Sequence, residues 1–239
     1  MNRAPLNLMD IEFMQTFMEL HRNMQSNPDV WAVIVHSTVD GYFSNGLDPA
    51  MMLKRDAKEK AEVFTVLLQM VKEVYAFEKP HISAIEGHAM AGGAVMAILS
   101  DWRFMSREKS RIAFSEVAVG LVIPRVIINL IESATGSQHL RTIAQLGTAI
   151  KSVDAQAMGL VDEVFGNGTV LREAEKYAKR LFDLPLASVR SVKRMLREKN
   201  IQALEAGEGL AEMQTFLGDN FNEGLRAVQE RRRPKFKNP

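Results

Sequence analysis

The stretch from Ile82 to Leu99, read as ISAIEGHAMAGGAVMAIL, constrains the fold more than any other part of the chain. Residues 82–85 form a short apolar run that predicts a buried strand, and residues 94–99 are small and apolar and predict a tightly packed helix. Gly92 and Gly93 lie where this helix would begin, so unpaired backbone N–H groups would lie at the positive end of its dipole. The stretch therefore predicts a site for an anion, or for an oxygen that becomes negative during a reaction.

Strand patterns fill the first part of the chain, and helical patterns dominate the second. Apolar runs predict strands over 31–36, 82–85, 101–105 and 111–114. The run 31–36 is nearly continuous in apolarity, which favours a strand covered on both faces. From Thr169 onward the pattern is helical, with a last helix expected over 201–232. This order predicts an α/β core followed by a helical region, in one large domain with or without a small appendage.

Composition excludes several classes of function. The 239 residues contain no cysteine, which excludes disulfides and thiolate chemistry, and the net charge of +1 gives no argument for nucleic-acid binding. The five histidines show no metal-ligand spacing, so no metal site is expected. No apolar run approaches the ~20 residues that span a bilayer, and neither end carries a recognisable targeting signal. We therefore expect a cytoplasmic protein that uses no metal, no membrane and no nucleic acid.

Three segments could converge on one site. The Asn45-Gly46 turn favours positive φ and can present the N–H of Leu47 outward. Together with the N–H of Gly92 it would supply two donors for one oxygen. Glu116 follows a predicted strand among apolar residues, where the charged form is disfavoured and the carboxylate is a better base near neutral pH. The set predicts proton abstraction next to a carbonyl, with the enolate oxygen held by two N–H groups.

Each of these features also has a simpler interpretation. The glycine pair at 92–93 could serve only to let a helix pack closely against a strand. The glycines match neither a phosphate loop, which needs a lysine, nor the dinucleotide fingerprint. The turn at 45–46 could be only a turn, and Glu116 could be solvated or paired with a cation. The basic run 231–235 could be a solvated tail, or it could meet phosphates.

The motifs together resemble one superfamily. The segments 43–48 (FSNGLD), 82–97, 115–120 (SEVAVG) with Pro124, 151–164 and 223–236 are similar, in this order, to the crotonase superfamily, also called the enoyl-CoA hydratase/isomerase family. The resemblance implies a crotonase-like spiral of ββα units over residues 1–182 and a C-terminal helical trimerisation region over 183–239. It also implies an acyl-CoA thioester substrate, no separate cofactor because CoA is part of the substrate, and a homotrimer or a dimer of trimers.

The resemblance also implies roles for particular residues. The N–H groups of Leu47 and Gly92 would form the oxyanion hole for the thioester carbonyl, and Glu116 would be catalytic. The loop from Asn45 to Pro49 would line the CoA and thioester groove, and the basic tail would approach the phosphates of CoA. The expected substrate-binding residues are Ser44, Asn45, Gly46, Asp48, Pro49 and Ser115.

One departure from the family pattern favours a particular reaction. Hydratases of the family use two glutamates, and the one expected three residues after the oxyanion glycine is Val95 here. Addition of water needs both carboxylates, whereas a 1,3-proton shift needs one. The chain therefore looks most like the Δ3,Δ2-enoyl-CoA isomerase branch, with Glu116 as the single acid/base. Another acyl-CoA reaction of the superfamily (hydratase or lyase, hydrolase, decarboxylase) and a non-catalytic acyl-CoA-binding subunit remain as alternatives.

A second departure lies at the start of the chain. The family usually has a strand hairpin before the segment matching residues 2–7, and it is absent here. Either the start is internal or the chain folds without the hairpin, which would expose a sheet edge. Because the three site segments lie downstream, we expect this departure to affect stability more than chemistry.

Overall fold

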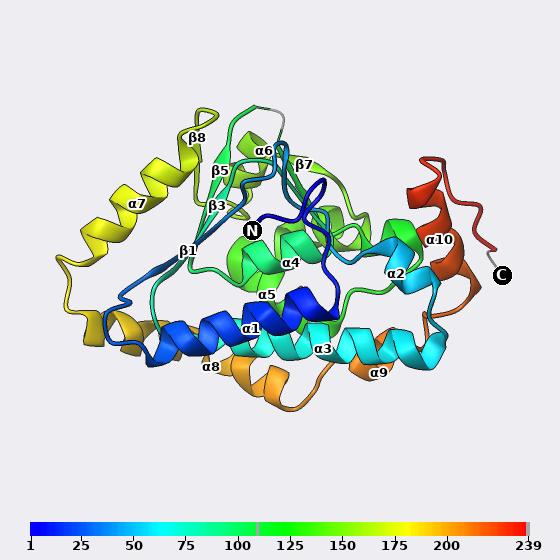
Figure 1. Cartoon of the computed structure of the whole chain (residues 1–239), viewed down its shortest axis with the longest axis horizontal. Helices are drawn as coiled ribbons and strands as arrows, with labels where there is room; N and C mark the ends of the chain where they lie inside the picture. Colours follow the sequence, from blue (N-terminus) through cyan, green and yellow to red (C-terminus); the bar gives the residue numbers. More distant parts are fainter. Residues whose placement is uncertain (109, 238–239) are drawn as a thin grey trace.

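The computed structural model describes residues 1–108 and 110–237, and within them two four-stranded sheets form the centre of the molecule (Figure 1). The first sheet, which is parallel throughout, contains in spatial order β1 (Val33–His36), β3 (His81–Ile85), β5 (Trp102–Ser106) and β8 (Glu163–Phe165). The second contains β2 (Tyr42–Ser44), β4 (His88–Met90), β6 (Arg111–Ala113) and β7 (Ile150–Lys151), with only the last pair antiparallel. From β1 to β6 successive strands alternate between the sheets, and helical segments follow each pair; β7 then pairs with β6 in the second sheet, and α6 leads to β8 in the first. This order confirms the predicted spiral of ββα units.

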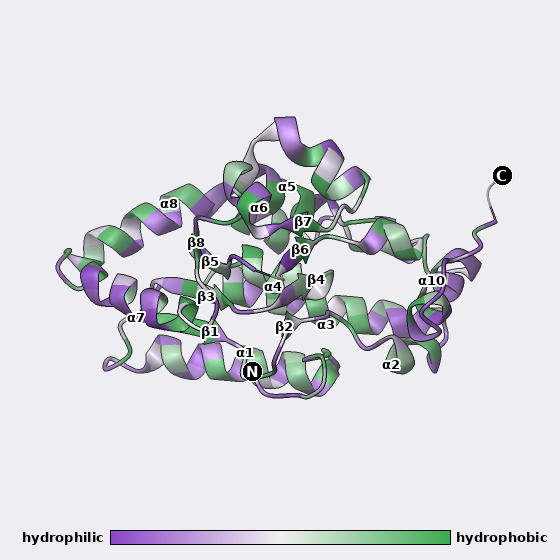
Figure 2. Ribbon diagram, turned by 90° about the horizontal axis from the view of Figure 1, so that it is seen from above, coloured by the Kyte–Doolittle hydropathy of each residue, from purple (hydrophilic) through white to green (hydrophobic). Residues whose placement is uncertain are grey.

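Helices cover both sheets. Those before the glycine turn are α1 (Ile11–Ser26), α2 (Pro49–Leu53) and α3 (Ala57–Tyr75), and those after it are α4 (Gly92–Ile98), α5 (Arg125–Thr135), α6 (Ser152–Ala157), α7 (Val170–Leu181), α8 (Leu186–Glu205), α9 (Leu210–Gln214) and α10 (Asp219–Gln229). All residues of α4 are buried, and Figure 2 shows this helix near the middle of the molecule. Figure 1 shows α1 and α3 side by side below the sheets, and α10 next to α2 at one end. No helix in the described part of the chain is long and apolar enough to cross a membrane.

Local sequence explains the starts of α1, α2 and α3. Asp10 accepts a hydrogen bond from Phe13 N at the start of α1, and Asp56 and Glu59 form a reciprocal capping box at the start of α3. Asp48 caps α2, whose first residue is Pro49, by accepting from Ala50 N at 2.8 Å. These caps fix where α2 and α3 begin, and therefore where the loop that precedes α2 ends.

Several sequence expectations are wrong in detail. Tyr42–Ser44 and His88–Met90, for which the sequence pattern predicts no strand, are strands, because three residues are too few for a periodic pattern to reveal. β1 lies at the edge of the described sheet and is not buried on both faces. The helix expected over 201–232 is divided into the end of α8, α9 and α10. Glycines 207 and 209, with φ of +72° and +99°, separate α8 from α9. The domain boundary at residue 182 stays a prediction.

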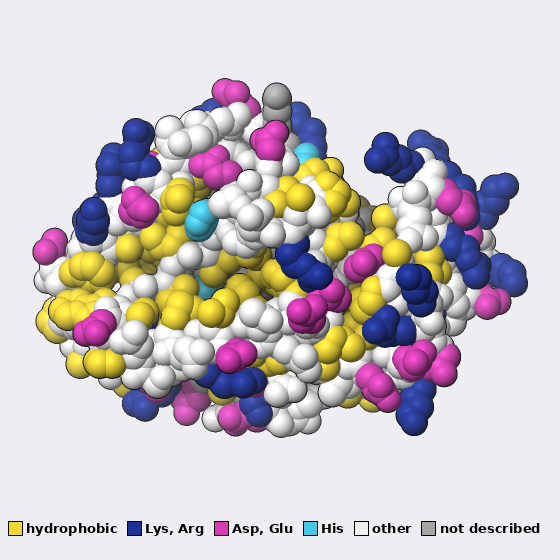
Figure 3. All heavy atoms as spheres, in the orientation of Figure 1, with side chains coloured by type: hydrophobic (Ala, Val, Ile, Leu, Met, Phe, Trp, Pro, Cys, Tyr) yellow, Lys and Arg dark blue, Asp and Glu magenta, His cyan; other side chains and the backbone are white. Residues whose placement is uncertain are grey.

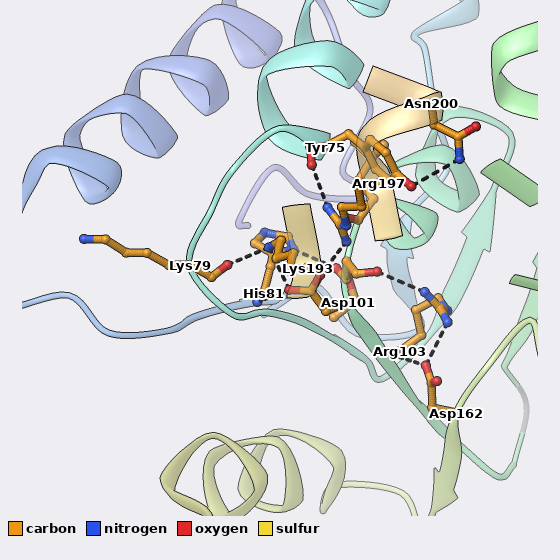
Figure 4. A network of polar contacts seen from close by, with 12 residues as sticks. Tyr75, Lys79, His81, Asp101, Arg103, Asp162, Lys193, Arg197 and Asn200 are labelled. Atoms are coloured by element: carbon orange, nitrogen blue, oxygen red, sulfur yellow. Dashed lines mark hydrogen bonds and ion pairs between the residues drawn. The ribbon is translucent and has the colours of Figure 1, made fainter. Parts of the chain in front are cut away.

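Helix α8 packs on the core through a polar face. Lys193, Arg197 and Asn200 are buried, whereas Met195 and Leu196 are 67% and 78% exposed. The buried cations meet Asp101, which follows α4 (Figure 4). This is the reverse of the usual amphipathic arrangement, in which the apolar face is buried.

Candidate active site

The loop before α2 and the first residue of α4 are in close contact. Gly46 adopts φ of +80°, and a Cβ atom there would lie 2.8 Å from Gly92 N. The N–H groups of Leu47 and Gly92 donate to no other residue in the described part of the chain. Both residues line one cavity. The two donors predicted from sequence therefore lie on touching backbone segments and face a shared space.

The two glycines at the start of α4 have different roles. A Cβ on Gly93 would lie 2.1 Å from Ser44 O, so Gly93 is required for close packing of α4 on β2. The simpler interpretation of the glycine pair is thus correct for Gly93. Ala91, immediately before Gly92, has φ of +47°, an uncommon conformation for a residue with a Cβ, and its N–H donates to Ala113 O at 2.7 Å. Strain of this kind gathers at functional sites, where the surrounding structure maintains it.

The cavity has a volume of about 260 Å³ and a lining that is almost wholly apolar. Its only polar side chains among the described lining residues are those of Asn45, Ser115 and Glu116. The apolar lining residues include Met52, Phe64, Leu67, Leu68, Val71, Val95, Leu121, Ile127, Met213, Phe221, Leu225 and Val228. Figure 3 shows a hollow with hydrophobic side chains between the main body and the end of the molecule that carries α10. Such a lining suits a hydrocarbon chain.

Glu116 is the ionisable group of this cavity. It comes shortly after β6, which ends at Ala113, and begins a short 3-10 helix, η1 (Glu116–Val119). Its Oε2 atom is buried and finds no hydrogen-bond partner among the described residues. Burial raises the pKa of this carboxyl to about 7, and no neighbouring charge contributes to the rise. The carboxylate is therefore prepared to accept a proton near neutral pH.

Helix α10 closes the cavity from the side of η1. Phe221 and Leu225 point their side chains into the lining, and Gly224 between them packs on η1, since a Cβ there would lie 2.3 Å from Val119 O. Gly120, with φ of +72°, ends η1 against Asn220. The closure of the cavity by α10 was not predicted from the sequence. The available signal was the i, i+4 spacing of two large apolar residues around a glycine.

The structure brings six of the nine predicted site residues to the cavity. These are Asn45, Leu47, Pro49, Gly92, Ser115 and Glu116. Ser44, Gly46 and Asp48 are not among its lining residues; Ser44 is fully buried, and Asp48 caps α2. The structure thus places these three as supports of the loop, and any contact with substrate stays a prediction.

Residues at the start of the chain also belong to the site. Met9 N donates to Gly46 O at 2.8 Å, Asp48 N donates to Met9 O at 3.0 Å, and the Met9 side chain packs near Gly92. Every site segment predicted from the sequence lies after residue 42, because backbone pairing between distant loops leaves no local signal. No group of three or more potential metal ligands occurs among residues 1–108 and 110–237.

Replacement of Gly46 by alanine is expected to damage the site more than the fold. The new Cβ would require φ of +80° for a residue with a side chain and would lie 2.8 Å from Gly92 N. We expect a loss of at least about 100-fold in kcat, the effect of removing one oxyanion donor. Steady-state kinetics checks this, with Gly168→Ala as control, because Gly168 also has positive φ but open space around it. Equal losses in both variants would contradict the assignment.

The fold and the site place two backbone N–H groups, without protein acceptors in the described part of the chain, beside one buried carboxylate, in a cavity lined almost wholly by apolar side chains. A family model described as Enoyl-CoA hydratase/isomerase matches residues 1–239, and the chain belongs to this family, within the crotonase superfamily and near its isomerase branch. Proteins of this family act on acyl-CoA thioesters.

The relatives include proteins described as isomerases and proteins described as hydratases. Enoyl-CoA delta isomerase 1 of rat mitochondria is 28% identical over 236 residues, which cover 97% of this chain and 81% of that protein. A Thermus thermophilus protein, provisionally called an enoyl-CoA hydratase, is 30% identical over 221 residues, or 90% and 86% of the two chains. The crystal structure of human mitochondrial delta3-delta2-enoyl-CoA isomerase superposes with a TM-score of 0.90 at 22% identity, and the match covers 96% of this chain and 90% of that chain. The last comparison confirms the fold.

Proposed function

We propose that this protein is an enoyl-CoA isomerase that moves the double bond of a 3-enoyl-CoA to the 2-trans position. The observation that carries the proposal is the single carboxylate of the site. Among the described lining residues Glu116 is the only ionisable one, and Val95 stands one helical turn after Gly92 where a hydratase of the family has its second glutamate.

The proposed chemistry uses three groups. The thioester oxygen accepts hydrogen bonds from the N–H groups of Leu47 and Gly92. The Glu116 carboxylate removes a proton from C2, and the electron pair delocalises over the adjoining thioester carbonyl and the C3–C4 double bond as a dienolate, with its negative charge mainly on the thioester oxygen. The same carboxyl then returns the proton to C4, so the double bond ends between C2 and C3 and no atom is gained or lost. The two N–H donors stabilise the charge that develops on the oxygen.

The apolar lining supports isomerisation over addition of water. A hydratase must hold a water molecule and activate it, and the neutral side chains of Asn45 and Ser115 cannot act as the second base. The aliphatic side chain of Val95 offers water no hydrogen bond. A proton shift between carbons of the substrate benefits from this dry environment, in which electrostatic interactions with the dienolate are stronger.

The decisive experiment compares three reactions of the same protein. Isomerisation of a 3-enoyl-CoA is followed by the rise in ultraviolet absorbance as the conjugated 2-enoyl thioester forms. Hydration is followed by the loss of that absorbance when 2-trans-enoyl-CoA is the substrate. Hydrolysis is followed by the release of free CoA thiol. We expect isomerisation to be fastest. Faster hydration or hydrolysis would assign another reaction of the superfamily, and tight CoA-ester binding without turnover would identify a non-catalytic subunit.

Activity is expected to depend on pH through Glu116. Because the carboxylate must be ionised to accept the C2 proton, and burial raises its pKa to about 7, kcat/KM rises with pH up to about 7 and then levels off. Below that pH the rate falls about tenfold per unit. A pH–rate profile checks this, with circular dichroism at each pH to show that the protein stays folded. A flat profile between about pH 5 and 8 would contradict it.

We further propose that the C-terminal region, 183–239, mediates assembly into a homotrimer or a dimer of trimers. Apolar side chains on the outer face of α8 support this proposal, since Val192, Met195 and Leu196 are all more than half exposed. Contiguous exposed apolar side chains of this kind mark protein interfaces.

A further inference from the structure

We propose that residues 6–9 form a template that leaves the N–H of Leu47 free for the substrate, with Ser44 and Asn7 as positioning residues. The inference rests on the proposed function in one respect, the role of Leu47 N–H as a donor to the thioester oxygen. It implies that residues 6–9, which lie far from Glu116 in sequence, affect catalysis by orienting the Leu47 N–H.

The hydrogen bonds of the loop single out Leu47. The N–H groups of residues 45, 46 and 48 all have acceptors. Asn45 N donates to Leu6 O at 3.0 Å, and Gly46 N donates to Ser44 Oγ at 3.2 Å. Asp48 N donates to Met9 O at 3.0 Å, and Gly46 O accepts from Met9 N at 2.8 Å. Because the neighbouring peptide groups are held in this way, the peptide plane between Gly46 and Leu47 is fixed, and only its N–H remains without an acceptor among the described residues.

Ser44 joins the loop to the template. Its side chain is fully buried, its hydroxyl donates to Asn7 O at 2.8 Å, and the same oxygen accepts from Gly46 N. Without this hydroxyl the Gly46 N–H would be buried and unpaired. A buried donor without an acceptor is costly, so the loop would rotate to satisfy it and the Leu47 N–H would turn with it.

Asn7 holds the template in place. It is fully buried with φ of +49°, a conformation that asparagine tolerates better than most residues. Its Nδ2 donates to Ser37 Oγ at 2.7 Å and to Phe43 O at 3.0 Å, and its Oδ1 accepts from Arg3 N at 2.7 Å. These bonds fix the Asn7 carbonyl that receives the Ser44 hydroxyl. The same segment reaches the second donor, because a Cβ on Gly92 would lie 3.4 Å from Met9 Cε.

The experiment separates positioning from simple stabilisation. Ser44→Ala is compared with Ser152→Ala, a matched control: Ser152 is also fully buried, and its hydroxyl also donates to a backbone carbonyl at 2.8 Å, that of Arg107. The probe is hexanoyl-CoA labelled with ¹³C at the carbonyl, a saturated thioester that cannot isomerise. Difference infrared spectra of the bound probe report hydrogen bonding to the carbonyl, and steady-state kinetics with a 3-enoyl-CoA gives kcat and KM.

We expect Ser44→Ala to lose at least half of the wild-type shift of the carbonyl band to lower frequency. Its kcat should fall about 10- to 100-fold with KM within about threefold, a part of the effect of losing one oxyanion donor. The melting temperature of Ser152→Ala should fall by about as much as that of Ser44→Ala, but Ser152→Ala should keep the wild-type carbonyl band shift and kcat. Asn7→Asp retains the size of the side chain but loses the hydrogen bonds that Asn7 donates to Ser37 and Phe43. It should show smaller losses of the carbonyl band shift and of kcat than Ser44→Ala, and it replaces Ser44→Ala in the test if that variant does not fold.

Other outcomes would be distinguishable. A full band shift and full kcat in Ser44→Ala, or equal losses of activity in the Ser44 and Ser152 variants, would overturn the template. Absence of a band shift in the wild type would overturn it as well, because no donor would then act on the carbonyl. A shift that is present in the wild type and lost in Ser44→Ala, with no turnover of any 3-enoyl-CoA, would support the template and reject the isomerase reaction.

Discussion

Replacement of Glu116 by glutamine is expected to abolish turnover of a 3-enoyl-CoA and at the same time to stabilise the folded protein. The loss of turnover follows because no other ionisable side chain among the described lining residues could carry the proton between C2 and C4. Loss of a sole general base costs about 100-fold or more in kcat. The gain in stability follows because the native site holds a carboxylate in an apolar cavity, where Oε2 finds no described partner.

The size of this gain depends on pH. Burial raises the pKa of Glu116 from 4.5 to about 7, so between these values the native state binds more protons than the unfolded state. The free energy of unfolding therefore falls as pH rises from 4.5 to about 7 and stays lowered above that. The full difference of about 2.5 units corresponds to about 3 kcal/mol. A glutamine amide stays buried and polar, so we expect Glu116→Gln to recover only about 1–2 kcal/mol.

Melting temperatures at two pH values check the stability part. At pH 8 Glu116→Gln should melt above the wild type, and at pH 5, where the wild-type carboxyl is already protonated, the difference should nearly vanish. Glu132→Gln on α5, which removes an exposed carboxylate, is the control and should change neither stability nor kcat. Retained activity in Glu116→Gln would eliminate the proposed mechanism. A lower melting temperature at pH 8 would show that the carboxylate is a structural group.

The parts of the site that could be predicted from sequence are those encoded by neighbouring residues. A strand followed by Gly92, a turn at Asn45-Gly46 and a carboxylate among apolar residues are local patterns, and each has a physical consequence wherever the segment lies. The residues alone offered their convergence on one site as a possibility, and the resemblance to a family turned it into a definite expectation. The direction of each side chain was not predictable, because Ser44 and Asn45 are adjacent polar residues of which one is fully buried and one lines the cavity.

The parts that could not be predicted depend on contacts between distant segments. Pairing of Met9 with the loop around Gly46 and packing of Gly224 on Val119 are backbone contacts that leave no periodic signal. Helix α8 shows a related difficulty. Its buried Lys193 and Arg197 lie four residues apart, a spacing that ordinarily indicates a solvated face. The counter-charge that explains their burial, Asp101, lies 92 residues before Lys193.

Replacement of Asp101 by asparagine is expected to be the most destabilising single change in the charged network of Figure 4. The Asp101 carboxylate contacts Lys193 Nζ and Arg197 Nη2, both at 2.7 Å, and accepts a hydrogen bond from His81 N at 2.8 Å. The cations are otherwise held by backbone carbonyls, with Lys193 donating to Lys79 O and Arg197 to Tyr75 O. Removing the only carboxylate that these two cations contact in the described structure leaves two buried positive charges beside each other. Breaking a buried ion pair from one side costs about 3–5 kcal/mol.

The pH dependence of this loss identifies its cause. Burial already lowers the pKa of Lys193 to about 8, and loss of the Asp101 charge should lower it further. Because the native pKa is below the unfolded value of 10.5, the native state binds fewer protons, and stability rises with pH from about 8 to 10.5. In Asp101→Asn this rise should begin at lower pH. The variant should therefore lose more free energy of unfolding at pH 6 than at pH 9, as urea titrations at the two pH values would show.

Two further variants decide whether charge or packing causes the loss of stability in Asp101→Asn. Glu73→Gln removes one partner of the exposed Arg22–Glu73 pair and should cost less than about 1 kcal/mol. Asp101→Asn combined with Lys193→Met removes a buried positive charge together with the negative one, so it should recover part of the loss. If the double variant is no more stable than Asp101→Asn, the loss arises from packing around residue 101. If it recovers, α8 is held on the core by charge, which leaves its apolar residues free to face outward.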